Sequence, residues 1–222
     1  MQIKELKIYS PNIKAQADFY SKLLSLTIIK ENSNFVSLQI GKSILKIEYS
    51  AESTPYHFAI NIPANKDIEA LEWLKERVAI LKDETNEIQD FDFWNAKAIY
   101  FYDEDQNIVE LIARNNLQNN TVNKFDSDSF LEISEIGLPT LDIEKEFKTL
   151  NKLTGIEVYD GGFERFCAIG DENGLFICIN KEKKDWFPTN EKAYSSDFEI
   201  QFIEKGSEYH FQFKNSELMS IA

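Results

Sequence analysis

Cysteine, histidine, proline and glycine are all scarce in this sequence. The 222 residues include 2 cysteines, 2 histidines, 5 prolines and 8 glycines. So little glycine and proline argues against collagen-like and linker-rich chains, and two histidines give little support for a Ser–His nucleophilic pair. Cys167 and Cys178 lack CxxC spacing. We therefore expect two buried thiols rather than a disulfide or a pair of metal ligands.

Long apolar runs and a positive charge balance are absent as well. No run approaches the roughly 20 apolar residues of a membrane span, and the first residues alternate charged and apolar side chains without the apolar core of a signal peptide. The formal net charge of −14 repels phosphate backbones and anionic lipid. We therefore expect a cytoplasmic protein whose partner is neither nucleic acid nor a membrane.

The residues that are present predict a repeated unit of one strand, one helix and three strands. Hydrophobic residues make up 43% of the chain, which is enough for a sizeable core. The first copy is expected at residues 4–9, 13–24, 26–30, 35–40 and 43–49. The second is expected at 57–62, 67–78, 88–93, 98–102 and 108–113. The period of about 55 residues indicates internal duplication.

A third copy follows a polar stretch at residues 115–123, which is the best candidate for a linker. Its elements are expected at residues 131–138, 142–153, 165–169 and 175–179. The strands at 198–203 and 209–213 have no helix between them, so the fourth copy is truncated or rearranged. One such unit cannot close a core alone, and pairing of units buries the sheet faces.

These patterns predict an α+β protein of tandem βαβββ modules. The modules are expected to pair into a cupped, mostly antiparallel sheet of eight strands, with a second, partial copy at the C-terminus. The predicted domains are residues 1–114, which hold the main pocket, and residues 124–222, a divergent module pair, joined by the linker 115–123.

Two ordered motifs resemble a known superfamily. In the first module, Asn12 is followed by Phe19-Tyr20 and by Leu24-Ser25-Leu26. The second module ends in Asp103-Glu-Asp-Gln-Asn107-Ile-Val-Glu110-Leu111, which is similar to a family pattern of Asp-Pro-Asp-Gly-Asn-x-Ile-Glu-Leu. This ordered set resembles the glyoxalase, bleomycin-resistance and extradiol-dioxygenase proteins of the vicinal oxygen chelate superfamily, with good coverage over residues 1–114 and weaker coverage beyond.

The resemblance implies a metal site built from four strands. Its positions carry over to Glu5, Lys46, His57 and Glu110, with Glu48 one pleat beyond Lys46. Glu5, His57 and Glu110 would be ligands of one divalent transition metal (Fe, Mn, Ni or Zn), and Lys46, Glu48 and Glu110 would be the catalytic acid–base or anchoring groups. Against a metal, Lys46 has no lone pair to offer and repels a cation, so a protein without a cofactor is the alternative.

The alternation of the strands predicts a polar pocket independently of the resemblance. One face of these strands is apolar and is expected to meet the helices: Leu6, Ile8, Leu45, Ile47, Phe58, Ile60, Val109 and Leu111. The other face is polar: Glu5, Lys7, Lys46, Glu48, His57, Asn61 and Glu110. Inward polar side chains are costly unless they line a wet or liganded cavity. We expect Lys7 and Asn61 to contact the ligand and Trp94 to stack on an aromatic one.

Three functions stay open at this point. The chain could be a metal-dependent lyase, isomerase or dioxygenase acting on a small oxygen-bearing molecule. It could instead be a metal-free small-molecule-binding protein, in which Glu5 and Glu110 balance lysines, or a non-catalytic scaffold copy. In the third module Ile133 is expected to match Glu5, so no metal set is expected from residues 124–222. That half could complete the architecture, support a homodimer or cap the first pocket.

Overall fold

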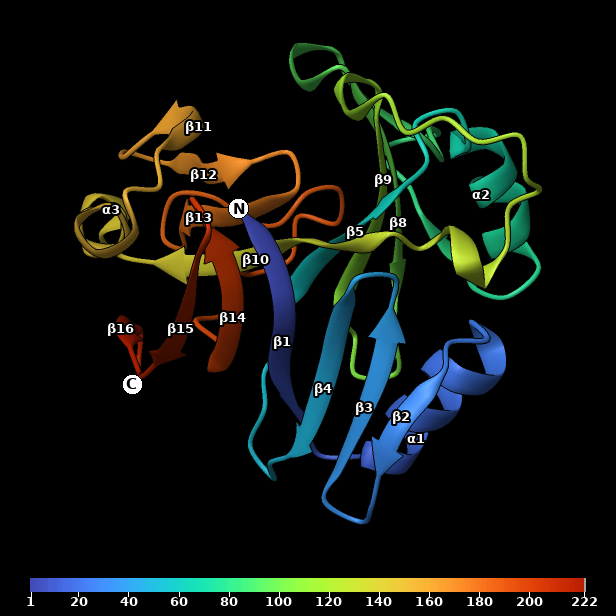
Figure 1. Cartoon of the computed structure of the whole chain (residues 1–222), viewed down its shortest axis with the longest axis horizontal. Coiled ribbons are helices and arrows are strands. Elements are labelled where there is room, and N and C mark those ends of the chain that lie inside the picture. The colour runs from blue at the N-terminus through green and yellow to red at the C-terminus, as the bar shows by residue number, and fades with distance from the viewer. Residues whose placement is uncertain (222) are drawn as a thin grey trace.

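Two mixed β-sheets form the body of the molecule in a computed structural model that describes residues 1–221 (Figure 1). Sheet A has seven strands in the order β16-β15-β14-β1-β4-β3-β2. Its strands are β1 (Gln2–Ser10), β2 (Ile28–Glu31), β3 (Phe35–Ile40), β4 (Ser43–Tyr49), β14 (Phe198–Glu204), β15 (Ser207–Lys214) and β16 (Glu217–Ser220).

Sheet B has nine strands in the order β11-β12-β13-β10-β5-β9-β8-β6, with β7 paired to β8. Its strands are β5 (His57–Ile62), β6 (Ile80–Leu81), β7 (Gln89–Phe91), β8 (Ala96–Tyr102), β9 (Ile108–Arg114), β10 (Glu132–Thr140), β11 (Val158–Gly162), β12 (Phe166–Asp171) and β13 (Gly174–Asn180). The α+β class and the tandem modules predicted from the sequence are confirmed.

Three helices join the strands within the modules. They are α1 (Ile13–Asp18), which continues as a π-helical turn over Phe19–Leu23, α2 (Asp67–Lys75) and α3 (Ile143–Thr154). The Asn12 side chain accepts a 3.1 Å hydrogen bond from the Ala15 amide, so it caps α1 as its polar side chain favours. Asp142 caps α3 in the same way through the Lys145 amide. None of the helices within residues 1–221 is long and apolar enough to cross a membrane.

The same strand pairing recurs in three modules. The opening strand lies parallel to the closing strand in each: β1 beside β4, β5 beside β9 and β10 beside β13. Such parallel pairs need a crossover, which the helix of each module supplies. The fourth module consists of the antiparallel strands β14, β15 and β16, and within the described chain it has no helix.

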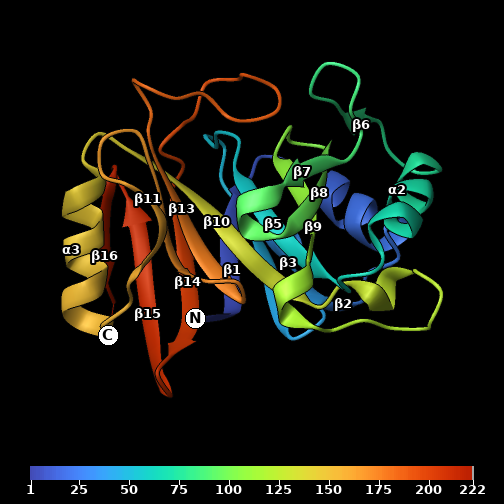
Figure 2. The same ribbon diagram turned by 90° about the horizontal axis from the view of Figure 1, so that it is seen from above.

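The pairing between modules differs from the prediction. The opening strand β1 pairs antiparallel with β14, and β5 pairs antiparallel with β10. Module one therefore shares sheet A with module four, and module two shares sheet B with module three (Figures 1 and 2). The predicted single sheet of modules one and two is wrong, because each opening strand offers the same backbone edge to any other opening strand.

Residues 115–123 help to set this pairing. The Asn119 side chain accepts a 2.8 Å hydrogen bond from the Ala64 amide, and Asn65 and Thr121 are joined by two more. The stretch predicted as a linker thus runs along module two. It delivers β10 beside β5, where the Leu131 amide donates to the Asn61 carbonyl at 2.9 Å.

The inner faces of both sheets meet in one hydrophobic core. All eight apolar alternates expected to meet the helices belong to it: Leu6, Ile8, Leu45, Ile47, Phe58, Ile60, Val109 and Leu111. Each fully buried side chain of this kind contributes about 1.5–3 kcal/mol of burial energy. Cys167 and Cys178 are free, buried thiols in this core, as the sequence predicted, and they lie opposite each other on β12 and β13.

Candidate functional site

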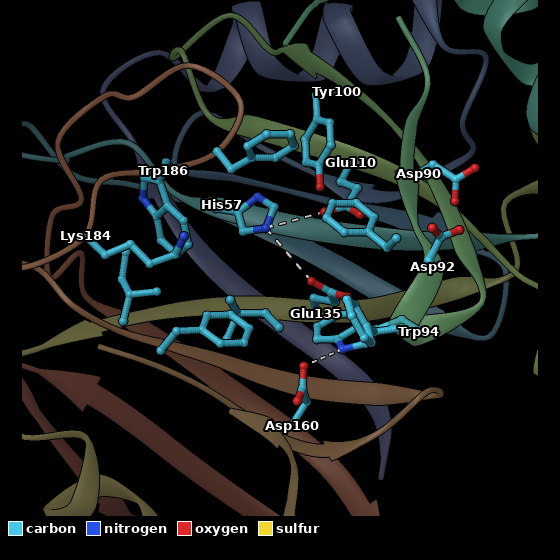
Figure 3. Close-up of a pocket in the computed structure, with 16 residues that line it drawn as sticks. His57, Asp90, Asp92, Trp94, Tyr100, Glu110, Glu135, Asp160, Lys184 and Trp186 are labelled. Atoms are coloured by element: carbon cyan, nitrogen blue, oxygen red, sulfur yellow. Dashed lines mark hydrogen bonds and ion pairs between the residues drawn. The ribbon is translucent and has the colours of Figure 1, made fainter. Parts of the chain in front are cut away.

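The outer face of sheet B brings one histidine and two glutamates together around Ala59. Ala59 on β5 pairs with Glu110 of β9 on one side and with Glu135 of β10 on the other. His57 lies two residues earlier on β5, and residues two apart in a strand share a face. The side chains of His57, Glu110 and Glu135 point toward one another (Figure 3), and the small Ala59 side chain between the two glutamates leaves room for them.

Hydrogen bonding fixes the orientation of the imidazole. His57 Nδ1 donates to the Ile108 carbonyl oxygen at 3.1 Å, so the lone pair of the neutral ring is on Nε2. Nε2 lies 3.6 Å from Oε2 of Glu110 and 3.9 Å from Oε2 of Glu135. The three residues are almost completely buried, at 6%, 2% and 3% relative exposure. One nitrogen and two oxygen donors therefore face a common point.

Burial and mutual repulsion set the charges of this cluster. Burial lowers the pKa of His57 to about 4, so the ring is neutral near pH 7. Burial, and next the charge of Glu135, raise the pKa of Glu110. Burial also raises the pKa of Glu135, but the guanidinium of Arg114 opposes that shift. Two carboxylates with no cation between them disfavour double ionisation.

Arg114 is the counter-charge of the cluster. Its side chain is fully buried at the end of β9 and donates from a terminal nitrogen to Oε1 of Glu135. Its Nε donates to Oδ1 of Asn61 at 3.2 Å, and Asn61 in turn donates to Glu132 at 3.1 Å. Arg114 thus holds one oxygen of Glu135 and leaves the other directed at His57.

The donor set fits a divalent transition metal. The candidate ligand atoms of His57, Glu110 and Glu135 all lie within 4.8 Å of one another. One imidazole and two carboxylates suit Fe, Mn, Ni or Zn, and a three-ligand site leaves positions open for another molecule. Ile177 occupies the position in module three that corresponds to Glu110 in module two. Glu110 pairs with Ala59, two residues after His57, and Ile177 pairs with Gly137, two residues after Glu135. These residues could hold a metal ion with three protein ligands.

An aromatic cavity of about 470 Å³ opens above the cluster. Its aromatic lining consists of Phe91, Phe93, Trp94, Tyr100, Phe166, Trp186 and Phe187. The Trp94 indole N–H donates to Asp160 at 2.7 Å, which fixes that ring on one wall. Trp94 therefore lines the cavity, and its contact with a ligand stays a prediction.

Trp186 forms the wall of the cavity opposite Trp94. It comes from the irregular segment 181–197 between β13 and β14, and its ring centre is 4.9 Å from that of His57 (Figure 3). A Cβ atom at Gly137 would be 2.7 Å from carbons of the Trp186 ring. Glycine at this position therefore allows Trp186 to lie directly on the strand beside the imidazole.

Four of the predicted site residues lie on the other sheet. Glu5, Lys7, Lys46 and Glu48 are on the outer face of sheet A. Lys7 forms a 2.5 Å ion pair with Glu199, and Lys46 forms a 3.0 Å ion pair with Glu48 rather than with Glu5 or Glu110. The prediction that Glu5 and Lys46 meet His57 and Glu110 is wrong, because β1 and β4 belong to sheet A. Asn61 supports Arg114 and does not line the cavity.

Glu135 was missed because of a β-bulge. In β1 the pairing register with β14 shifts between Ile3 and Glu5, and in β10 the register with β5 shifts between Ile133 and Glu135. The two bulges are equivalent, so Glu135 and not Ile133 matches Glu5. The expected match of Ile133 with Glu5 is therefore wrong, and Glu135 is the member of the cluster that comes from residues 124–222. The sequence signal is a spacing of three between apolar residues, Ile133–Ile136, repeating Ile3–Leu6.

Comparisons with known proteins agree with this architecture. No family model matches the sequence, and no curated protein matches it. A protein from Bacillus subtilis described as a candidate dioxygenase superposes with a TM-score of 0.59 and 14% identity, over 81% of this chain and 63% of its own. A glyoxalase I variant from Zea mays gives 0.54 and 14%, over 80% of this chain and 66% of its own.

The chain thus spans about two thirds of the length of both structures. At such low identity the likeness concerns the fold, and fold alone does not assign an activity. The repeated βαβββ modules, their paired opening strands and these superpositions together show that the chain has the fold of the vicinal oxygen chelate superfamily.

Proposed function

We propose that this protein is a metal-dependent enzyme that binds one divalent transition metal through His57, Glu110 and Glu135. Its substrate would be a small oxygen-bearing molecule that occupies the aromatic cavity, and its reaction a lyase, isomerase or dioxygenase reaction. The observation that carries the proposal is the convergence of three buried donor side chains from three different strands at the floor of that cavity. Buried carboxylates facing one another are costly without a cation.

Each protein group has a definable part in this proposal. The Ile108 carbonyl keeps the Nε2 lone pair of His57 directed at the site. Arg114 restrains Glu135 so that one oxygen stays free. Trp94 and Trp186 form opposite walls that exclude water and orient a flat ligand. When bound, the metal ion would act as a Lewis acid that polarises oxygen atoms of the ligand.

A metal-free binding protein is the second candidate. Two observations favour it: Arg114 already neutralises Glu135, and Ile177 replaces a fourth ligand. In that case the aromatic walls would supply the affinity, and the buried cluster would hydrogen-bond to the ligand. The two candidates share one cavity and differ only in the presence of the ion.

Metal analysis of the protein purified without chelators separates the two. We expect close to one transition metal ion per chain, loss of that ion in His57→Ala, and retention in His210→Ala. His210 is the other histidine of the chain and lies on sheet A, so it is a matched control. Glu135→Gln and Glu199→Gln provide the same comparison for a carboxylate.

Thermal unfolding with added metal gives a second reading. Metal at 100 times its dissociation constant should stabilise the protein by about 2.7 kcal/mol, which is roughly 5–10 °C for a chain of this size. If the purified protein holds no metal and none of Fe, Mn, Ni or Zn stabilises it, the metal proposal fails. Stabilisation by an aromatic ligand alone would then favour the binding protein.

A further inference from the structure

Lys184 lies in the wall of the aromatic cavity and is not among the proposed metal ligands. It comes near the start of the segment 181–197, where its backbone amide donates to the Asn180 carbonyl at 3.0 Å. Its side chain lines the cavity on the same side as Trp186 (Figure 3). The residue is half-buried, and its Nζ atom is 5.8 Å from the centre of the Phe166 ring, which also lines the cavity. An amino group is thus held against an aromatic wall.

No counter-charge accompanies this amino group within residues 1–221. None of the ion pairs in that part of the chain includes Lys184, although its neighbour Lys183 lies 3.8 Å from Glu164. The charge that acts on Lys184 is instead that of Arg165, which has the same sign. The surroundings of Lys184 therefore do not favour its ammonium form.

The same surroundings increase the neutral fraction of the amine. Burial, and next the positive charge of Arg165, lower the pKa of Lys184. The ammonium form has only hydrogen-bond donors, whereas the neutral amine has a lone pair that can attack another atom. A lysine that is desolvated or placed beside another cation is activated as a nucleophile in this way. The position of Lys184 in the cavity wall combines both conditions.

The other groups of the cavity indicate an uncharged reaction partner for this amine. The carboxyl groups of Glu110, Glu135 and Asp160 line the same cavity and disfavour an anionic ligand. Lys184 is therefore a poor anchor for a carboxylate or a phosphate. The aromatic walls favour a molecule with an apolar body. An uncharged group that a neutral amine attacks is the carbonyl group of an aldehyde or a ketone.

We propose that Lys184 is a nucleophile that captures a small, uncharged aldehyde or ketone in the aromatic cavity as a Schiff base. The Nζ lone pair adds to the carbonyl carbon while one amine proton passes to the oxygen, which gives a carbinolamine. The hydroxyl group and the second amine proton then leave as water, so that a C=N bond replaces the C=O bond. The reaction consumes no oxidant and no reductant. It is separate from the metal-dependent function, because Lys184 does not belong to the donor set of His57, Glu110 and Glu135.

Reductive trapping with hexanal tests this inference. Hexanal is uncharged and has an apolar chain, and cyanoborohydride reduces its Schiff base to a stable amine that peptide mass spectrometry locates. The full chain is treated at about pH 7 in a chelator, so that the result is independent of any metal. We expect Lys184 to be modified about tenfold faster than the exposed lysines, because more of its amine is neutral and the cavity retains the alkyl chain. In urea this difference should disappear, because it arises from the fold.

Two lysine variants confirm the position of the reactive amine. Lys184→Met should abolish the fast modification. Lys183→Met should keep it, because the Lys183 side chain is exposed and lies beside Glu164. The proposal is overturned if Lys184 in the folded parent reacts no faster than the exposed lysines, if another lysine is the fast site, or if the difference persists in urea. None of these outcomes bears on the metal content of the parent, which tests the metal-dependent function separately.

Discussion

Replacement of Arg114 by methionine tests the electrostatic account of the site. Arg114 is fully buried, and its partner Glu135 has a side chain that is only 4% exposed. Removing one partner of a buried ion pair leaves an uncompensated charge and typically costs about 3–5 kcal/mol. In a chain of this size each kcal/mol corresponds to about 2–4 °C. The metal-free Arg114→Met variant should therefore unfold roughly 6–20 °C below the parent.

The double variant separates charge from packing. Adding Glu135→Gln to Arg114→Met removes the stranded carboxylate and should recover most of the lost stability, whereas a packing defect would persist. Divalent metal should also stabilise Arg114→Met more than the parent, because the guanidinium no longer competes for Glu135. Urea unfolding in a chelator measures the loss in Arg114→Met and the recovery in the double variant. The same experiment with zinc measures the stabilisation by metal. A loss below about 1 kcal/mol in Arg114→Met, or no recovery in the double variant, would refute this account.

Two further predictions concern the cavity wall and the imidazole. Gly137→Ala places a Cβ atom 2.7 Å from the Trp186 ring, so we expect a red-shifted tryptophan emission and weaker binding of an aromatic ligand. Gly162→Ala, whose Cβ meets nothing within 4 Å, is the control, and an unchanged emission spectrum in Gly137→Ala would contradict this packing. Burial lowers the pKa of His57 to about 4, so between about pH 6.5 and 4 the unfolded chain takes up a proton that the folded chain does not. As the pH is lowered through this window, His57 therefore reduces the free energy of unfolding by up to about 3 kcal/mol. Urea unfolding at pH 6.5 and 4.5 measures this loss of unfolding free energy. The part due to His57 should be abolished in His57→Phe and retained in His210→Phe, and equal losses in the two variants would exclude His57 as its source.

Local features of the fold could be predicted because their causes are local. The alternation of Leu6 and Ile8 in β1 fixes which face of the strand is buried, and that face does lie in the core. The cap at Asn12 depends on residues within one turn. Such features need no knowledge of which strand lies next to which, so the sequence is sufficient for them.

The partner of each opening strand could not be predicted in this way. Backbone hydrogen bonds between β5 and β10 are chemically the same as those that β5 would form with β1. The choice is made by the hydrogen bonds of residues 115–123 to module two and by the combined burial of both sheets. These are long-range terms, and no local pattern encodes them.

The same distinction explains which site residues could be found. His57 and Glu110 belong to one module, whose parallel pairing of β5 with β9 sets their separation. Glu135 comes from another module and is displaced by a bulge, so its match depended on a pairing that was not known. Trp186 belongs to an irregular segment with no periodicity to indicate its position.

The duplication explains why we propose a cation site on sheet B and not at the equivalent positions of sheet A. The bulge in β1 makes Glu199 and His210 on sheet A the counterparts of His57 and Glu110 on sheet B. On sheet A the Lys7 ammonium lies 2.5 Å from Glu199 and already supplies the positive charge that a metal ion would bring. On sheet B the guanidinium of Arg114 reaches only the far oxygen of its carboxylate partner, and the near oxygens face the imidazole. The pair on sheet A is thus closed to a cation because the Lys7 ammonium is already present, whereas His57 and Glu110 on sheet B have no lysine beside them.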